Sequence, residues 1–150
     1  HGALVLQLGS REAAEDVAQE ALARAWERWA QVSAMANPEG WVFRVAFNLA
    51  STDRRRRRVA DRVAALRPLA PLVDRTDDIL SVHAALAELP PRQRAAVVLR
   101  FFADLDVAAT AEVMGCAPGT VKALTSQAVQ SLRMRLDTDV DEEGEVVPGA

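Results

Sequence analysis

The chain has 150 residues, of which 50% are hydrophobic and 26% are charged, and its formal net charge is −3 at pH 7. This composition is typical of a folded protein and excludes a disordered chain. One cysteine excludes an internal disulfide and a cysteine-cluster zinc site, and two histidines are too few for a metal site without carboxylates. The longest charge-free runs are too short to span a membrane, and Ala3–Leu8 is too short for a signal peptide. We therefore expect a cytoplasmic protein without direct membrane insertion.

The charge is unevenly distributed. Residues 137–150 hold six acidic residues and no base, so residues 1–136 carry a net charge of +3. Of the 18 basic residues 17 are arginines, and five of these are consecutive, namely Arg54, Arg55, Arg56, Arg57 and Arg58. Arginine pairs well with phosphate, but a solvated helix face explains such a run equally well, so the run alone does not establish nucleic-acid binding. We expect the acidic segment to be a disordered tail.

The first half of the chain predicts two long helices. Apolar residues recur at spacings of three and four from Ser10 to Val32, which predicts one helix with a single buried stripe. That stripe comprises Ala14, Val17, Ala18, Ala21, Leu22, Ala25, Trp26 and Trp29. The opposite face is acidic. Asn37 and Pro38 predict the cap and first turn of a second helix, which continues into the arginine run.

The second half predicts a linker followed by four helices. Residues 59–77 contain Pro68 and Pro71 and show no clear period. Helices are then predicted over Asp78–Leu89, Pro91–Ala103, Val107–Met114 and Pro118 to about Leu136, with Asp106 and Gly115 capping the third of these. Their buried stripes include Ala95, Val98, Leu99 and Phe102 in the second, and Val121, Leu124, Ala128 and Leu132 in the last.

No strand is predicted, so the expected fold class is all-α. We expect two small helical domains joined by a linker, the second of which contains a helix-turn-helix. The expected boundaries are 1–58 for the first domain, 59–77 for the linker, 78–136 for the second domain and 137–150 for the tail.

The segment Asp106–Leu136 has the order of a helix-turn-helix, namely a short helix, a tight turn with glycine, and a longer helix. The second helix of such a unit enters the major groove of DNA with its N-terminal residues against base edges. The residues that then face outward are Thr120, Lys122, Ala123, Ser126 and Gln127. An ordinary helical hairpin shares this turn chemistry and is the alternative for the segment taken alone.

Three segments resemble the extracytoplasmic-function sigma factors, in an actinobacterial-type version. SREAAEDVAQEALARAWERW (Ser10–Trp29) resembles region 2.2, NPEGWVFRVAFNLASTDRRRRR (Asn37–Arg58) resembles regions 2.3 and 2.4, and LPPRQRAAVVLRFFADLDVAATAEVMGCAPGTVKALTSQAVQSLRMRL (Leu89–Leu136) resembles region 4. Their order and spacing also match, over about Gly2–Leu136. The chain departs from the family in a shortened N-terminal region, in Thr52 where Asp is frequent, and in Leu124 and Gln127 where many members carry Arg.

The resemblance implies a dissociable promoter-specificity subunit of bacterial RNA polymerase. It implies that the polar face of the first helix docks on core polymerase, chiefly through Asp16, Gln19, Glu20 and Arg24. Plain solvation of an acidic face is the alternative reading of these residues without the family.

The resemblance also implies which residues bind DNA. At the minus-ten element, one base is flipped into a pocket formed by the loop Gln31–Gly40 and Asn48, whose amide offers both a donor and an acceptor. Trp41 lies near the melted strand or in the core. The last helix reads the minus-thirty-five duplex through the five outward residues named above. The residues that hold phosphates are Arg44, Arg54, Arg55, Arg56, Arg57 and Arg58.

The implied partners are core RNA polymerase, promoter DNA and a cognate anti-sigma factor. No cofactor, small-molecule substrate or catalytic centre is expected, because the chain has no glycine-rich phosphate loop, histidine–carboxylate cluster or nucleophile motif. Arg92 and Arg94 are interpreted as flanking phosphate contacts or as surface charges. The alternative function is a stand-alone helix-turn-helix regulator that binds duplex DNA, which leaves the first half of the chain unexplained.

Overall fold

The computed structural model describes residues 1–61 and 77–143, with side chains for residues 1–52, 82–135 and 137. The first half contains α1 (Gly2–Leu8), α2 (Arg11–Glu27), α3 (Trp29–Val32) and α4 (Pro38–Asp61). The second half contains α5 (Asp77–Glu88), α6 (Pro91–Val97), the π-helical turn η1 (Val98–Phe102), α7 (Val107–Met114) and α8 (Pro118–Glu143). Because the described residues hold these helices and no strand, the all-α prediction is confirmed.

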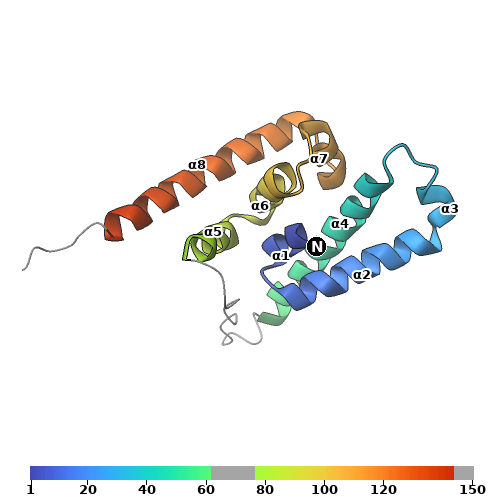
Figure 1. Cartoon of the computed structure of the whole chain (residues 1–150), viewed down its shortest axis with the longest axis horizontal. Helices are drawn as coiled ribbons and strands as arrows, with labels where there is room; N and C mark the ends of the chain where they lie inside the picture. The colour runs from blue at the N-terminus through green and yellow to red at the C-terminus, as the bar shows by residue number, and fades with distance from the viewer. Residues whose placement is uncertain (62–76, 144–150) are drawn as a thin grey trace, which may run out of the picture.

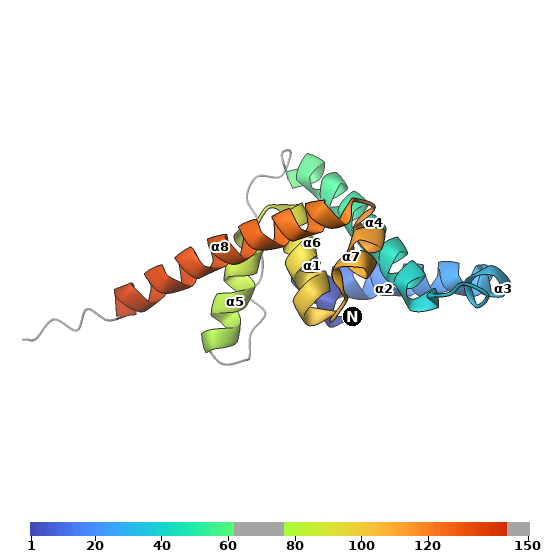
Figure 2. The ribbon, with the colours of Figure 1, turned by 90° about the horizontal axis from the view of Figure 1, so that it is seen from above.

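Helix α1, which the sequence pattern did not predict, lies in the middle of the molecule (Figures 1 and 2). It packs against α2 and α4 of the first half and against α5, α6 and η1 of the second. Leu4 and Leu6 are buried, and Gly9 ends the helix with a φ of 69° while its N–H donates to the carbonyl oxygen of Val5 at 2.7 Å. Seven residues are too few to show a helical period, which is why the pattern missed this element.

The first predicted helix is interrupted at Arg28, so the prediction of one helix over 10–32 was wrong in its continuity. Arg28 has φ −112° and ψ 23°, and a separate short helix, α3, follows it. Ser10 caps α2 as predicted, since its Oγ accepts from the N–H of Ala13 at 3.2 Å.

Part of the predicted stripe on α2 is exposed. Its small residues Ala14, Ala21 and Ala25 are buried, and α2 packs against α4. The large residues at the edge of the stripe are exposed, namely Leu22 at 59%, Trp26 at 79% and Trp29 at 54%. The small alanine side chains let α2 and α4 approach closely. The predicted stripe is wider than this contact, so the large residues at its edge stay exposed.

Helix α4 begins where the sequence predicted. The Oδ1 atom of Asn37 accepts from the N–H of Gly40 at 2.8 Å, and a Cβ atom at Gly40 would lie 2.5 Å from Nδ2 of Asn37. A side chain at position 40 would therefore require the capping side chain of Asn37 to move. The helix continues to Asp61, so residues 59–61 of the predicted linker are helical, and residues 62–76 lie outside the described part.

The predicted helix Pro91–Ala103 changes from α to π geometry at Val98. The N–H of Ala103 donates to the carbonyl oxygen of Val98 at 3.0 Å, five residues back. One extra residue in a turn rotates everything after it around the axis. Phe102 is therefore 53% exposed, and its assignment to the buried stripe was wrong, whereas Ala95, Val98 and Leu99 are buried as predicted.

Helix α7 has the predicted bounds and α8 extends beyond its prediction. The Oδ1 atom of Asp106 accepts from the N–H of Ala109 at 2.7 Å, and Gly115 ends α7 with a φ of 63°. Helix α8 continues to Glu143, so residues 137–143 of the expected disordered tail are helical, and residues 144–150 lie outside the described part. Repulsion between acids on a helix costs only a few tenths of a kcal/mol per pair, and no glycine or proline interrupts the segment before Gly144.

The two halves share one hydrophobic core. Leu4, Val17 and Phe47 of the first half belong to the same buried cluster as Leu86 and Leu99 of the second. Helix α4 of the first half packs against α7 of the second half. Helix α1 of the first half contacts α5, α6 and η1 of the second half. The expected pair of helical units is therefore packed into one body.

Arg94 on α6 lies inside this core, with only 4% of its surface exposed. Its Nε donates to the carbonyl oxygen of Leu86 at 2.6 Å and its Nη2 to that of Leu89 at 3.2 Å, with a further bond to Ala87. Its Nη1 donates to the carbonyl oxygen of Gln7, at 3.1 Å, in the other half. Both interpretations of Arg94 from the sequence, as a phosphate contact or a surface charge, are therefore wrong.

The shared core predicts a large difference between two leucines. Leu99→Ala removes a fully buried side chain and is expected to lower the free energy of unfolding by about 2–5 kcal/mol. Leu22→Ala removes an exposed side chain, and we expect a change within about 0.5 kcal/mol. Urea unfolding followed by circular dichroism measures both, and equal losses would contradict the assignment of the core.

Candidate nucleic-acid interface and docking face

The N-terminal half of α8 presents a row of exposed residues above a buried stripe. Val121 and Ala128 are fully buried and fix the helix against the rest of the second half. The turn before α8 is closed by the N–H of Cys116, which donates to the carbonyl oxygen of Ala111 at 3.0 Å. The predicted reading residues are all exposed, namely Thr120, Lys122, Ala123, Ser126 and Gln127.

One of these residues is already engaged by a neighbouring helix. The Oε1 atom of Gln127 accepts from Nε2 of Gln93 on α6 at 3.3 Å. This bond joins the reading residues of α8 to α6.

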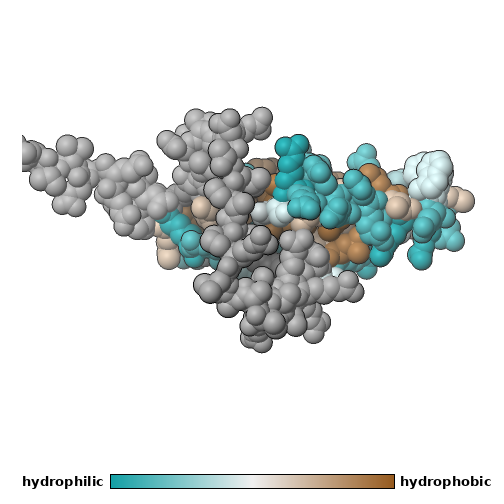
Figure 3. All heavy atoms as spheres, turned by 90° about the horizontal axis from the view of Figure 1, so that it is seen from below, coloured by the Kyte–Doolittle hydropathy of each residue, from teal (hydrophilic) through white to brown (hydrophobic). Residues whose placement is uncertain are grey.

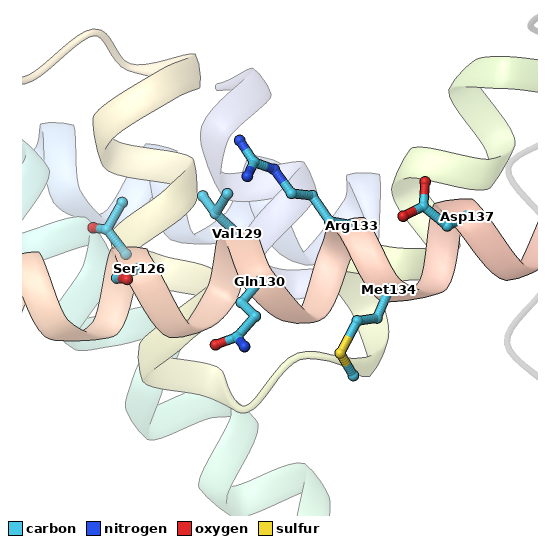
Figure 4. Close-up of a pocket in the computed structure, with 7 residues that line it drawn as sticks. Ser126, Val129, Gln130, Arg133, Met134 and Asp137 are labelled. Atoms are coloured by element: carbon cyan, nitrogen blue, oxygen red, sulfur yellow. The ribbon is translucent and has the colours of Figure 1, made fainter.

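A shallow groove of about 440 Å³ follows the same helix (Figure 4). All the described residues that line it belong to α8. Ser126, one of the predicted reading residues (the reading row), lies at one end of the groove, and Arg133 and Asp137 lie toward the other end. A groove lined by one helix is a surface feature of that helix, and it does not enclose a ligand as a substrate site does.

Helix α4 presents a second polar row. Trp41, Arg44 and Asn48 follow spacings of three and four, so they lie on one side of the helix. Arg44 and Asn48 are exposed and Trp41 is half-buried, whereas Ala46 and Phe47 are buried. Trp41 thus has one part covered and another at the surface, and its role at the melted strand stays a prediction.

The arginine run continues α4 beyond this row. The backbone of residues 54–58 is helical, as the sequence predicted, and the helix extends three residues past the run. The side chains of the run, however, lie outside the described part of the chain, so their contact with phosphate stays a prediction. This applies to Arg54, Arg55, Arg56, Arg57 and Arg58 alike.

The outer face of α2 combines acidic and apolar residues. The predicted docking residues Asp16, Gln19, Glu20 and Arg24 are all exposed, and Nε of Arg24 lies 2.7 Å from Oε1 of Glu20. Leu22 and Trp26 lie three and seven residues after Gln19 and hence on its side of the helix. Figure 3 shows apolar areas between polar ones on the end of the molecule that holds α2 and α3.

Sequence reasoning missed Leu22 and Trp26 as surface residues because it assigned them to the buried stripe. The width of the predicted stripe is the feature of the sequence that could have indicated their exposure. At 100° per residue around the helix axis, Leu22 and Trp26 lie about 60° and 100° from Ala25. The buried alanines instead cluster around the direction of Ala25. We call the exposed set Asp16, Gln19, Glu20, Leu22, Arg24 and Trp26 the α2 docking face.

Metal and membrane features are not found in the described part of the chain. No group of three or more His, Cys, Asp and Glu residues there is arranged to hold a metal ion. Likewise, no helix among the described residues is long and apolar enough to cross a membrane.

Known proteins match both halves. A family model described as Sigma-70 region 2 matches residues 3–59, and one described as Sigma-70, region 4 matches residues 79–132. The chain is 32% identical over 132 residues to the RNA polymerase sigma-E factor of Streptomyces antibioticus, across 85% of this chain and 73% of the relative. It is 33% identical over 136 residues to the ECF RNA polymerase sigma factor SigL of Mycobacterium tuberculosis, across 85% and 77%. The chain belongs to the extracytoplasmic-function sigma factors.

Two further comparisons agree with this assignment. The sigma factor is 36% identical over 120 residues to SigM of Mycobacterium tuberculosis, and it spans 61% of that relative. Its fold matches that of the sigma factor RpoE from Bartonella quintana, solved in complex with the anti-sigma factor NepR, with a TM-score of 0.78 at 24% identity, across 92% of this chain and 89% of that one. At this identity the match describes the fold.

The arginine run yields a prediction on salt dependence. Five consecutive positions are distributed around the whole circumference of a helix, so one DNA surface meets about two or three of them. Replacing Arg54–Arg58 by Gln should therefore lower the slope of log affinity against log salt by about 2, at about 0.7–0.9 per lost contact.

Filter binding to promoter DNA between low and moderate salt measures this slope. Arg11→Gln with Arg28→Gln, two exposed changes on and just after α2, is the control and should leave the slope unchanged. An unchanged slope in the five-residue variant would show that the run is merely solvated.

Proposed function

We propose that this sigma factor docks on core RNA polymerase in the cytoplasm and directs transcription initiation at minus-ten and minus-thirty-five elements. It does so without a cofactor or a catalytic centre of its own. The observation that carries the proposal is the α2 docking face, because a regulator that binds DNA through α8 alone leaves the exposed Trp26 and Leu22 of the first half without a role.

The chemistry of the α2 docking face suits a protein partner. Trp26 is 79% exposed and Leu22 is 59% exposed, and both lie beside the exposed amide of Gln19. Interfaces concentrate their binding energy in aromatic anchors surrounded by polar residues. Asp16 and Glu20 add negative charge at the rim, which favours a basic partner surface and speeds association.

The polar row on α4 is suited to a single-stranded, unstacked base. An asparagine amide pairs with a base edge as donor and acceptor together, and a half-buried indole offers a stacking surface that its covered part holds in place. We assign this role to Asn48 and Trp41, with the loop Gln31–Gly40 completing the pocket. Arg44 and the run Arg54–Arg58 are assigned to phosphate, which contributes affinity without reading sequence.

The reading row on α8 is suited to the major groove. Its residues lie at the N-terminal end of the second helix of a helix-turn-helix, which is the end that meets base edges in such units. Lys122 is the single base among them, so the second half by itself is expected to bind duplex DNA weakly. An anti-sigma factor is a further proposed partner, supported by the complex in which the structural relative was solved.

The docking proposal is tested by titrating labelled sigma factor into core RNA polymerase without DNA and measuring fluorescence anisotropy. We expect saturable binding that another sigma factor displaces. Trp26→Ala should weaken it at least about tenfold, because it removes the aromatic anchor. Glu20→Lys should weaken it severalfold by reversing a rim charge.

The matched control is Glu112→Lys, an exposed glutamate on α7, which should leave polymerase affinity within about twofold. Absence of polymerase binding by a protein with intact helicity would instead favour the stand-alone regulator.

The pocket assignment predicts a selective defect. Asn48→Ala should reduce discrimination at one minus-ten base by roughly 5- to 150-fold, since it removes one bidentate amide contact worth about 1–3 kcal/mol. Discrimination at the minus-thirty-five element should not change. In vitro transcription from promoters with single-base substitutions measures both, and equal losses at the two elements would overturn the assignment.

A further inference from the structure

The groove on α8 has the shape that a second helix fits. The residues that line it form two rows in which the spacing is four (Figure 4). One row runs from Thr125 to Asp137, and the other runs from Ser126 to Met134. Side chains spaced by four form ridges, and a partner helix packs its own ridge into the groove between them. The space of about 440 Å³ along these rows therefore suits a helix better than a small molecule.

The groove lies on the side of α8 that faces away from the protein's own core. Ala128 is fully buried, and at 100° per residue Ser126, Arg133 and Asp137 lie roughly 140–180° around the helix from it. Arg135 forms an ion pair with Glu88 at the end of α5. Beyond this pair α8 extends past α5 and away from the other described helices (Figures 1 and 2). The groove face of α8 is therefore open to a partner.

The charge on α8 is divided between its two ends. Residues 118–136 hold Lys122, Arg133 and Arg135 and no acid, whereas residues 137–143 hold five acids and no base. Position 141 is about 28 Å along the axis from position 122, so within one straight helix the acidic end does not reach the basic part. A second α8 that runs antiparallel supplies the complementary charge, because it places an acidic end beside each basic part. The sequence of α8 thus favours a second copy of this chain as the occupant of the groove.

One pair of groove residues fixes the register of such a dimer. Arg133 and Asp137 are both exposed, and no ion pair joins them to each other in the described part of the chain. An antiparallel pair that sets Arg133 against Asp137 of the second copy is two-fold symmetric about position 135, so the same contact forms twice. Residues 127–143 of the two copies then overlap over about 25 Å, and residues 141–143 of one copy lie opposite residues 127–129 of the other.

We propose that two copies of this sigma factor pair antiparallel through the groove face of α8, and that the pair excludes duplex DNA from the reading row. Ser126 belongs to both the groove and the reading row, and the acidic end of the second copy lies opposite Gln127, where it repels phosphate. The exclusion of DNA rests on the proposed function, whereas the pairing rests on the groove and the charges of α8. The sigma factor thereby limits its own access to the minus-thirty-five element as its concentration rises.

The pairing is tested by sedimentation equilibrium of the full chain at low salt, from micromolar to millimolar concentration. We expect a reversible equilibrium between monomer and dimer. Arg133→Asp and Asp137→Arg should each weaken the dimer at least about fivefold, because both symmetric contacts become repulsive. The double variant with both changes exchanges the two charges and should pair within about twofold of wild type. Circular dichroism should show the same helical content in all four proteins, since both residues are exposed.

The matched control is Arg28→Asp, the same charge change at an exposed position just after α2, and it should leave the dimer unchanged. A wild type that stays monomeric over the whole range of concentration would overturn the pairing. A double variant that pairs no better than the single variants would overturn the antiparallel contact.

The exclusion of DNA is tested by adding a duplex that carries the minus-thirty-five element to the dimer. A saturating amount should convert the dimer to complexes with one chain each, because binding and pairing compete for α8. A complex that holds the duplex and still contains the paired chains would overturn the exclusion. If the dilute monomer does not bind the duplex at all, the reading row of the proposed function fails and the exclusion fails with it, while sedimentation without DNA still decides the pairing.

Discussion

A single buried guanidinium organises the centre of this sigma factor. Arg94 is almost completely enclosed, and a buried charge is tolerated only when hydrogen bonds replace its lost water. The carbonyl oxygens of Leu86, Ala87 and Leu89, at the end of α5, and of Gln7, at the end of α1, supply these bonds. The packing of α6 is therefore coupled to the ends of two helices that belong to different halves.

The positions of the reading surfaces follow from this centre. Hydrogen bonds hold α1 against α6, and in the same arrangement α4 lies against α7. The helix-turn-helix is buried on the side opposite to its reading row. The polar rows of α4 and α8 then face solvent, and so does the α2 docking face. The arrangement leaves the predicted contact residues whose side chains are described at least partly accessible.

Local chemistry in the sequence predicted the ends of several elements, but long-range contacts decided what the pattern missed. Asn37, Asp106 and Gly115 act within three or four residues, so their caps are readable without any tertiary information. The burial of Arg94 depends on a residue 87 positions away, and the exposure of Trp26 depends on how closely α4 approaches.

The reading row on α8 was predictable because its residues lie around Val121 and Ala128 on a helix with a clear stripe. The roles of these residues stay predictions, since exposure shows that they are accessible and does not show what they bind. The same holds for the arginine run, whose helical backbone the pattern predicted and whose phosphate contacts depend on which side of α4 the DNA approaches.

The contact between α1 and the second half also contains one buried polar atom that is not satisfied. The Oε1 atom of Gln7 is buried and has no hydrogen-bond partner among the described residues. An unsatisfied buried acceptor costs about 1–3 kcal/mol, so this atom offsets part of the stability that the hydrogen bonds of Gln7 to Pro91 and Arg94 supply.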